Sequence, residues 1–141
     1  MPGLHNLVAQ GLAADAALVA GVQGSSATPV DGLPVTPFVV IGPPRGSITP
    51  GSWERLFITY PMHLFFIRAA SADRDQVAIN DFLDLFITGF RAGITLGVAG
   101  VVEAVIASWD TNKEQDVGGE TYQLIEFAVS VEVDRAATYT P

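Results

Sequence analysis

The sequence predicts an α+β domain in which two helices pack on one face of a four- to five-stranded, mostly antiparallel sheet. Two segments have helical periodicity with a single apolar stripe each, and the other apolar runs are bounded by Pro or Gly. Two such helices need one sheet face to cover their stripes, and the strands are too few for a sandwich. The 141 residues suit one domain, so residues 1–141 are treated as one unit with a loose tail from about residue 136.

The first helix is predicted from residue 4 onward, where apolar residues recur at helical spacing as far as Val22 and alanines fill much of the rest. Gly21 and Gly24 are the expected stops. Residues 23–37 are rich in Gly, Ser, Pro and Thr, which predicts a loop.

The strand at Phe38–Ile41 is short and has proline on both sides. The stretch Arg45–Trp53 is predicted to be an exposed loop. Residues 54–68 are then apolar at nearly every position, whereas a strand with one exposed face would alternate. We therefore expect both faces of this strand to be covered, one by the helices and the other by a second layer or another subunit. Pro61 predicts an edge position or a bulge.

The second helix is predicted over residues 71–91, with a broad apolar face. Val101–Trp109 is a further strand candidate. The polar segment Asp110–Glu120 is predicted to be a turn, because Gly118 and Gly119 tolerate positive φ. The last strand, residues 121–133, alternates: apolar residues from Ile125 to Val133 point one way and acidic or small polar residues the other.

Composition limits the classes of function. Seven basic residues stand against fifteen acidic ones, a net charge of -8, and the basic residues are scattered. Such a chain does not suit binding to nucleic acid through phosphates, but it suits a surface that repels DNA. There is no cysteine, which excludes disulfides and thiolate nucleophiles. The apolar runs fall short of a membrane span of about 20 residues and the start has no basic secretory region, so we expect a soluble protein made in the cytoplasm.

We predict no catalytic, cofactor-binding or metal-binding residues. His5 and His63 are far apart in sequence with no evident third ligand. Asp81 and Asp84 are one helical turn apart, which a solvated helix face explains. The glycines after the second helix do not fit a dinucleotide-binding pattern.

Three residues are candidates for a subunit interface: Arg45, Ile48 and Trp53. Trp53 has two interpretations, as an anchor of its own loop on the core or as an interface residue, since Trp and Arg are enriched at hot spots. Ile48 lies between Ser and Thr with little core within reach, which favours an interface.

In the order of its elements the chain resembles the tail terminator (tail completion) proteins of long-tailed phages. The similarity is carried by the segments Thr36–Gly42, Phe65–Arg68, Ala72–Gln76 and Gly118–Tyr122, which follow the first helix, end the long strand, begin the second helix and precede the last strand. The resemblance implies a structural, non-enzymatic virion protein. Members of that family form hexameric rings that cap the tail tube, end its polymerisation and join it to the head.

The implied partners are other copies of the chain, the tail tube protein and the head-completion or connector protein, with genomic DNA passing through unbound. The implied location is the tail or neck of the virion, after assembly in the host cytoplasm, with no membrane association. On charge grounds, Glu114, Asp116, Glu120, Glu126 and Glu132 are candidates for the lining of the ring, although they suit a soluble outer rim equally well.

Other functions stay open from the sequence. Another head–tail neck protein, such as a head-closure or stopper protein, or a tail-tube-related subunit would have the same general character. A small-ligand-binding or enzymatic α+β domain, with its site between subunits, is the alternative from a different class.

Overall fold

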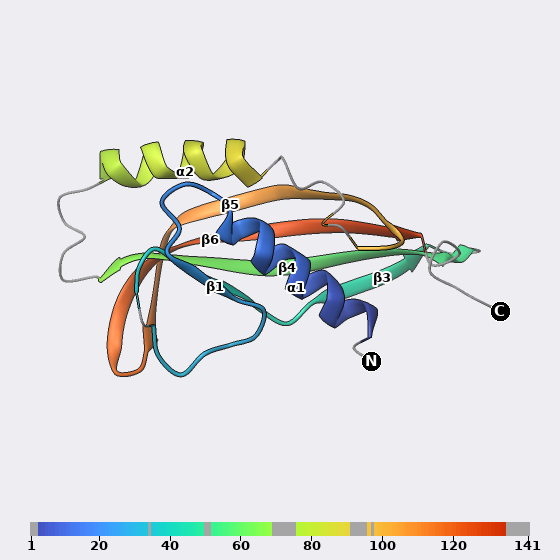
Figure 1. The fold of residues 1–141 in the computed structure, drawn as a ribbon, viewed down its shortest axis with the longest axis horizontal. Helices are drawn as coiled ribbons and strands as arrows, with labels where there is room; N and C mark the ends of the chain where they lie inside the picture. Colours follow the sequence, from blue (N-terminus) through green and yellow to red (C-terminus); the bar gives the residue numbers. More distant parts are fainter. Residues whose placement is uncertain are drawn as a thin grey trace.

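The computed structural model describes residues 3–33, 35–49, 52–68, 76–90, 96 and 98–134 (Figure 1). The helices are α1 (Leu4–Ala17) and α2 (Gln76–Phe90). The strands are β1 (Gly24–Ser26), β2 (Phe38–Ile41), β3 (Arg45–Thr49), β4 (Ser52–Arg68), β5 (Val101–Val117) and β6 (Glu120–Asp134). They form one sheet in the order β1-β2-β4-β6-β5, and β3 pairs with β4 beyond the end of β2.

The predicted α+β class and its two helices are confirmed, but the predicted number of strands was too low. The described residues form six strands, and the sheet is mixed because β1 runs parallel to β2. β1 lies inside the segment predicted to be a loop. Its three residues, Gly-Ser-Ser, have no apolar pattern, and β1 is held by its pairing with β2 and by the Ser25 hydroxyl, which donates to the Ala13 carbonyl at 2.7 Å.

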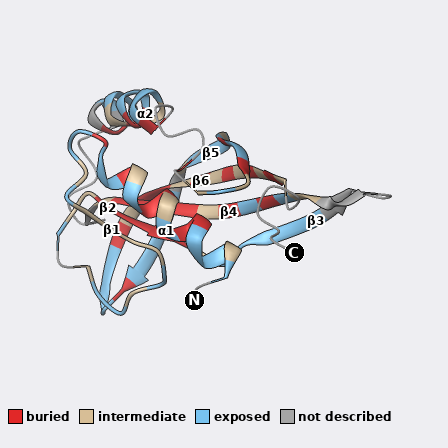
Figure 2. Ribbon diagram, turned by 45° about the vertical axis from the view of Figure 1, so that its right-hand side comes forward, coloured by how far each residue is buried: buried red, intermediate tan, exposed pale blue. Residues whose placement is uncertain are grey.

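Both helices pack on the same face of the sheet, where one core joins them to β4 and β6 (Figure 2). From α1 the core takes Val8 and Leu12, and from α2 it takes Ile79, Phe86 and Phe90. The Phe86 ring stacks on Phe127 of β6 with centroids 4.9 Å apart. The helix stripes and one side of the sheet therefore cover each other, as the sequence predicts.

The first helix ends earlier than its apolar stripe. α1 stops at Ala17, and a turn leads to Gly21, whose φ of 93° favours glycine. A Cβ at Gly21 would lie 2.8 Å from the Phe82 ring of α2, so the chain passes close to the second helix here. α2 lies within its predicted range, and residues 71–75 and 91 are outside the described part.

The prediction for Pro61 was wrong, because β4 is an interior strand and Pro61 pairs with Ala128 in unbroken register. β2 ends opposite Met62 and β3 begins opposite Thr59, so Pro61 faces the gap between these two neighbours. Its carbonyl accepts from the Gly42 N–H at 2.8 Å. Proline is tolerated inside the sheet because no strand residue lies in that gap to accept a hydrogen bond from a backbone N–H at position 61.

The predicted loop Arg45–Trp53 is instead the strand β3 and the start of β4. β3 pairs antiparallel with β4 from Arg45 opposite Thr59 to Thr49 opposite Ser52. Pairing with a long partner compensates for the weak strand propensity of Arg-Gly-Ser, which the sequence pattern alone could not show. The side chains of Ile48 and Trp53 lie outside the described part of the structure.

The predicted turn at Asp110–Glu120 is also mostly strand. β5 continues to Val117 and β6 begins at Glu120, which leaves a two-residue turn at Gly118 and Gly119. Their φ values of 61° and 86° are those of the tight hairpin turns that match strand twist. The polar segment stays extended because β6 supplies a partner for it, and the Thr121 hydroxyl hydrogen-bonds to the Asp116 carboxylate across the hairpin.

The alternation predicted for the last strand is confirmed. Ile125, Phe127, Val129, Val131 and Val133 are buried in the core under the helices. The intervening residues from Glu126 to Asp134 are only partly buried, on the opposite face.

Tyr60 provides a prediction about alkaline stability. Its ring is buried, its hydroxyl donates to the His5 carbonyl at 2.9 Å, and burial raises its pKa to about 12 from an ordinary 10. Because the folded pKa is the higher one, this stabilisation is complete below pH 10 and is lost as the pH rises toward 12. The free energy of unfolding should fall over that window in urea titrations. Tyr60→Phe should show a smaller fall, and an equal fall would contradict the assignment.

Candidate functional site

The face of the sheet that points away from the helices is the candidate site, and we call it the open face. Residues directly opposite each other in antiparallel strands share a face. Glu126, Ala128, Ser130 and Glu132 alternate with the core residues of β6, so they and their register partners on β4 and β5 form the open face.

One end of the open face is covered by the chain itself. A second apolar cluster lies there, built from residues of β2, β4, β5 and β6: Phe38, Val40, Phe65, Val117, Tyr122 and Leu124. Val30 and Leu33 pack on it from the connection between β1 and β2. The expectation that both faces of the long strand are covered holds at this end, where the second layer is this loop.

The middle of the open face is not covered by the described residues. Thr59 is exposed, and Pro61, Ala128 and Ser130 are half-buried, so the surface is made of short uncharged side chains. Two larger apolar side chains lie beside it, Phe57 at 41% exposure and Val105 at 40%. Such a surface offers area for contact.

Ion pairs lie on both sides of this uncharged middle. At one end, the Arg55 guanidinium is 2.8 Å from the Glu132 carboxylate and 4.0 Å from that of Asp134. Toward the covered end, His63 Nε2 is 3.1 Å from Glu126 Oε2, and Lys113 lies 4.0 Å from Asp110. All are partly exposed, so the Arg55 and Lys113 pairs each contribute about 0–1 kcal/mol to stability and mainly balance charge, while His63 and Glu126 share a hydrogen bond.

The five acidic residues predicted to line a channel do not form a single patch. Glu126 and Glu132 lie on the open face, each beside a basic partner, and Glu120 follows the hairpin turn in register with Val117. Glu114 and Asp116 alternate to the other face of β5, in register with Gln123 and Thr121. Among the interface candidates, Arg45 is exposed and is the register partner of Thr59 on the open face.

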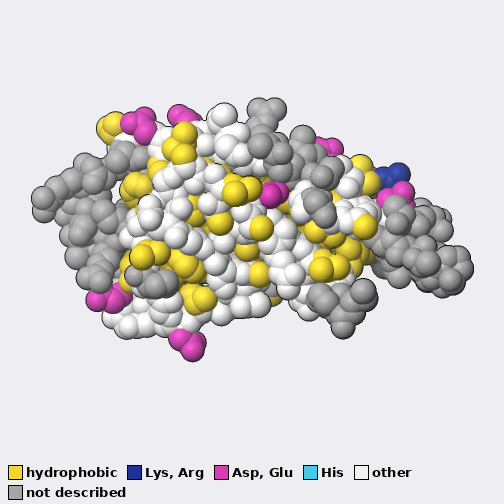
Figure 3. Space-filling view, in the orientation of Figure 1, with side chains coloured by type: hydrophobic (Ala, Val, Ile, Leu, Met, Phe, Trp, Pro, Cys, Tyr) yellow, Lys and Arg dark blue, Asp and Glu magenta, His cyan; other side chains and the backbone are white. Residues whose placement is uncertain are grey.

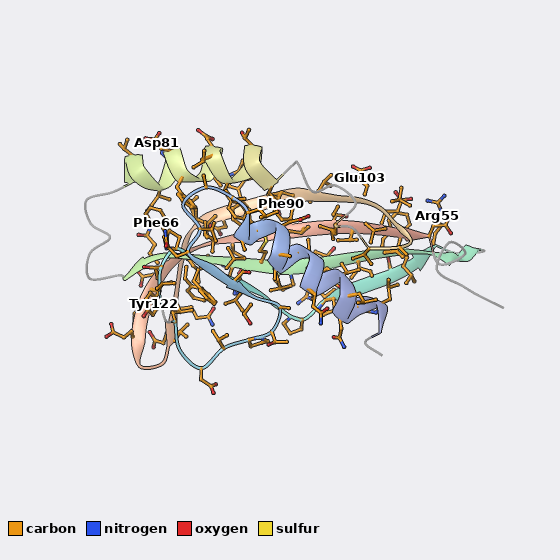
Figure 4. All side chains as sticks on the ribbon, viewed as in Figure 1. Arg55, Phe66, Asp81, Phe90, Glu103 and Tyr122 are labelled. Carbon is orange, nitrogen blue, oxygen red and sulfur yellow. The ribbon has the colours of Figure 1, made fainter. Side chains whose placement is uncertain are left out.

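Three acidic residues of this face were not among the predicted candidates: Asp110, Asp134 and Glu103. The register partner of Glu103 on β6 is Glu132, so two like charges are directly opposite each other. Such a pair is unfavourable unless a cation is near. Arg55 binds Glu132, and no ion pair joins Glu103 to another described residue. Figure 4 shows Glu103 and Arg55 at the same end of the molecule, far from Tyr122. The signal in the sequence was a single charge inside the apolar run 98–107.

The rest of the described surface gives no stronger candidate. The helix-bearing side shows mostly uncharged side chains, with hydrophobic atoms scattered over it (Figure 3). Burial raises the pKa of Asp15 on α1, and its Oδ2 atom has no hydrogen-bond partner among the described residues. Within the described ranges, no group of His, Asp and Glu residues has the arrangement of a metal site. None of the described helices has the length and apolar character needed to cross a membrane.

No protein-family model matches the chain, and a search of curated proteins gave no match either.

Proposed function

We propose that the chain is a structural virion protein of a long-tailed phage, a tail terminator that forms a ring on the tail tube, ends its polymerisation and joins it to the head. The order of elements supports this proposal: a helix, a hairpin ending in a long strand, a second helix and a second long hairpin. The observation that carries it is the open face, whose middle is a sheet surface of short uncharged side chains that no other described residues cover.

In this proposal the open face lines the channel and the helices lie outside. The face carries six acidic residues, Glu103, Asp110, Glu120, Glu126, Glu132 and Asp134, against three cations, Arg45, Arg55 and Lys113. That difference gives a net charge of -3 per subunit with neutral histidine. Because most of its cations are already bound to carboxylates, the surface has little capacity to hold DNA phosphates, as a conduit requires.

The experiment that tests the function is removal of the protein from the virus that encodes it. Loss of a terminator should give tubes of uncontrolled length and filled heads without joined tails, both visible by negative-stain microscopy. Complementation with the intact chain should restore normal particles. Tubes of normal length that lack only the head would instead favour a head-closure protein, and normal joined particles would exclude the proposal.

The charge of the open face gives a second prediction. Replacing Glu126 and Glu132 together by lysine changes the net charge of the chain from -8 to -4, removes the acidic partner of His63 and leaves Arg55 with Asp134 alone, at 4.0 Å. This variant should acquire DNA binding that weakens with added salt, whereas the unaltered protein should show none in fluorescence anisotropy with duplex DNA. Changing exposed acids of α2, Asp81 and Asp84, to lysine is the control for charge alone.

Salt-sensitive DNA binding by the unaltered protein would contradict a passive channel. Equal binding by the two variants would show that net charge, and not the open face, is responsible.

A further inference from the structure

The two lateral edges of the sheet differ in length and in charge. On one side, β5 pairs with β6 alone among the described residues; on the other side, β3 pairs with β4 alone. β5 contains four acidic residues and one lysine, a net charge of -3, whereas β3 contains Arg45 and no acid. The exposed edge of β3 is visible in Figure 2.

β5 has the composition of a strand that a partner covers. Three of its apolar side chains are exposed, Val102 at 43%, Val105 at 40% and Trp109 at 53%. An edge strand presents unpaired backbone groups that can pair with another chain, and charges and bulges restrict such pairing to its regular segments. Register shifts between Val101 and Glu103 and between Ile106 and Ser108 leave Glu103–Ile106 as a regular run, which matches the short length of β3.

From this asymmetry we infer that the edge of β5 binds the edge of β3 in a second copy of the chain. This joint specifies how the subunits of the proposed ring are held together. It rests on the proposed function only for the number of copies in the ring. Strand direction permits it: along β3-β4-β6-β5 each neighbour is antiparallel, so a following β3 beside β5 continues the same alternation. The joint would extend the sheet from one subunit to the next by backbone hydrogen bonds.

Charge complementarity selects this pairing over the symmetric ones. Two copies of β5 would bring segments of net charge -3 together, which is unfavourable across a strand pair, and two copies of β3 would place two arginines in one short joint that contains no acid. In the mixed joint, Arg45 meets Glu103. Neither has an ion pair within the described part of the chain, so each gains a partner.

Arg45 and Glu103 also lie at neighbouring positions along the strand direction, in adjacent register rows of the sheet. Across one subunit, Arg45, Thr59, Ser130 and Val105 form one row, and Ser47, Phe57, Glu132 and Glu103 form the next. If the subunits join without stagger, Arg45 lies opposite Val105 of the next copy and diagonal to Glu103. A long side chain reaches a diagonal neighbour. Such a joint uses different surfaces on the two partners, so it leads to a closed ring or an open filament and not to a two-fold dimer.

The test is zero-length cross-linking of concentrated protein. In Arg45→Lys the charge is kept and an amine is introduced, which a carbodiimide can join to a carboxylate in contact with it. Mass spectrometry of a mixture of isotope-labelled and unlabelled chains should find position 45 linked to Glu103 of a different chain. Within one chain these positions are three strand spacings apart, about 14 Å, so a link inside one subunit is not expected. The link should be lost in Arg45→Lys with Glu103→Gln.

Charge reversal provides the second arm. Arg45→Glu and Glu103→Arg should each weaken self-association in sedimentation experiments, and the double variant should restore it. Asp81→Arg on the exposed surface of α2 is the matched control. A link from position 45 to other acids only, the absence of any link between chains, or single reversals that leave association unchanged would overturn the inference. Specific linking in a ring of other than six copies would support the joint while contradicting the hexameric ring that the resemblance implies.

Discussion

Phe86→Ala is expected to lower the free energy of unfolding by about 3–5 kcal/mol, the largest effect predicted for a single substitution in this chain. Phe86 is fully buried, stacks on Phe127 at 4.9 Å and contacts Phe90 at 5.8 Å between ring centroids. Its removal leaves a cavity between α2 and β6. Urea unfolding followed by circular dichroism measures the change.

Leu85→Ala is the control, because Leu85 is the adjacent residue on the same helix but is 48% exposed. It should cost less than about 1 kcal/mol, since surface substitutions have small effects. Similar losses at the two positions would show that α2 does not pack on the sheet through Phe86. The comparison therefore tests the orientation of α2, which places both helices on the face opposite the proposed channel.

Gly118→Ala is expected to be the second largest effect, a loss of about 2–3 kcal/mol. Gly118 has a φ of 61°, and a Cβ there would lie 2.9 Å from the backbone carbonyl oxygen of Asp31. The substitution must displace either the hairpin turn or the loop that carries Val30 and Leu33. The covering of one end of the open face should loosen, which amide hydrogen exchange of residues 27–33 would detect.

Gly119→Ala separates the two causes of this loss, the positive φ of the backbone and the contact of the new Cβ with the Asp31 carbonyl oxygen. Gly119 also has a positive φ, of 86°, but no atom lies within 4 Å of a Cβ placed there. Only the backbone penalty of about 1–2 kcal/mol should remain, and exchange in residues 27–33 should not change. If the two variants lose equal stability, the contact between the hairpin turn and the loop has no energetic role.

The parts of the fold that the sequence predicted are those in which apolar periodicity is strong. The stripe around Phe86, the run of β4 and the alternation from Ile125 to Val133 each predicted an element and its buried side, because burial in one core selects these patterns directly. The same reasoning failed for β3 and for the outer part of β5. Their residues are polar, and they are strands only because a long neighbouring strand supplies hydrogen-bond partners.

Less of the candidate site than of the fold could be predicted from the sequence. The acidic character of the chain and the absence of cysteine were readable from composition, as was the acidity of individual candidates such as Glu126 and Glu132. Their partners were not: Arg55 is 77 positions from Glu132, and His63 is 63 positions from Glu126. Only the register of β4 against β6 brings these charges together, and that register is set by the packing of the whole sheet.

By itself, therefore, the sequence determined the α+β class, the two helices, the strongly apolar strands and the net charge of -8. The tertiary structure decided which residues share a face, which acids are neutralised by neighbours and which strand edges stay open. The physical reason is that burial acts on each segment locally through its pattern of apolar residues. Strand pairing, by contrast, joins residues far apart in the chain, and no local pattern specifies the partner.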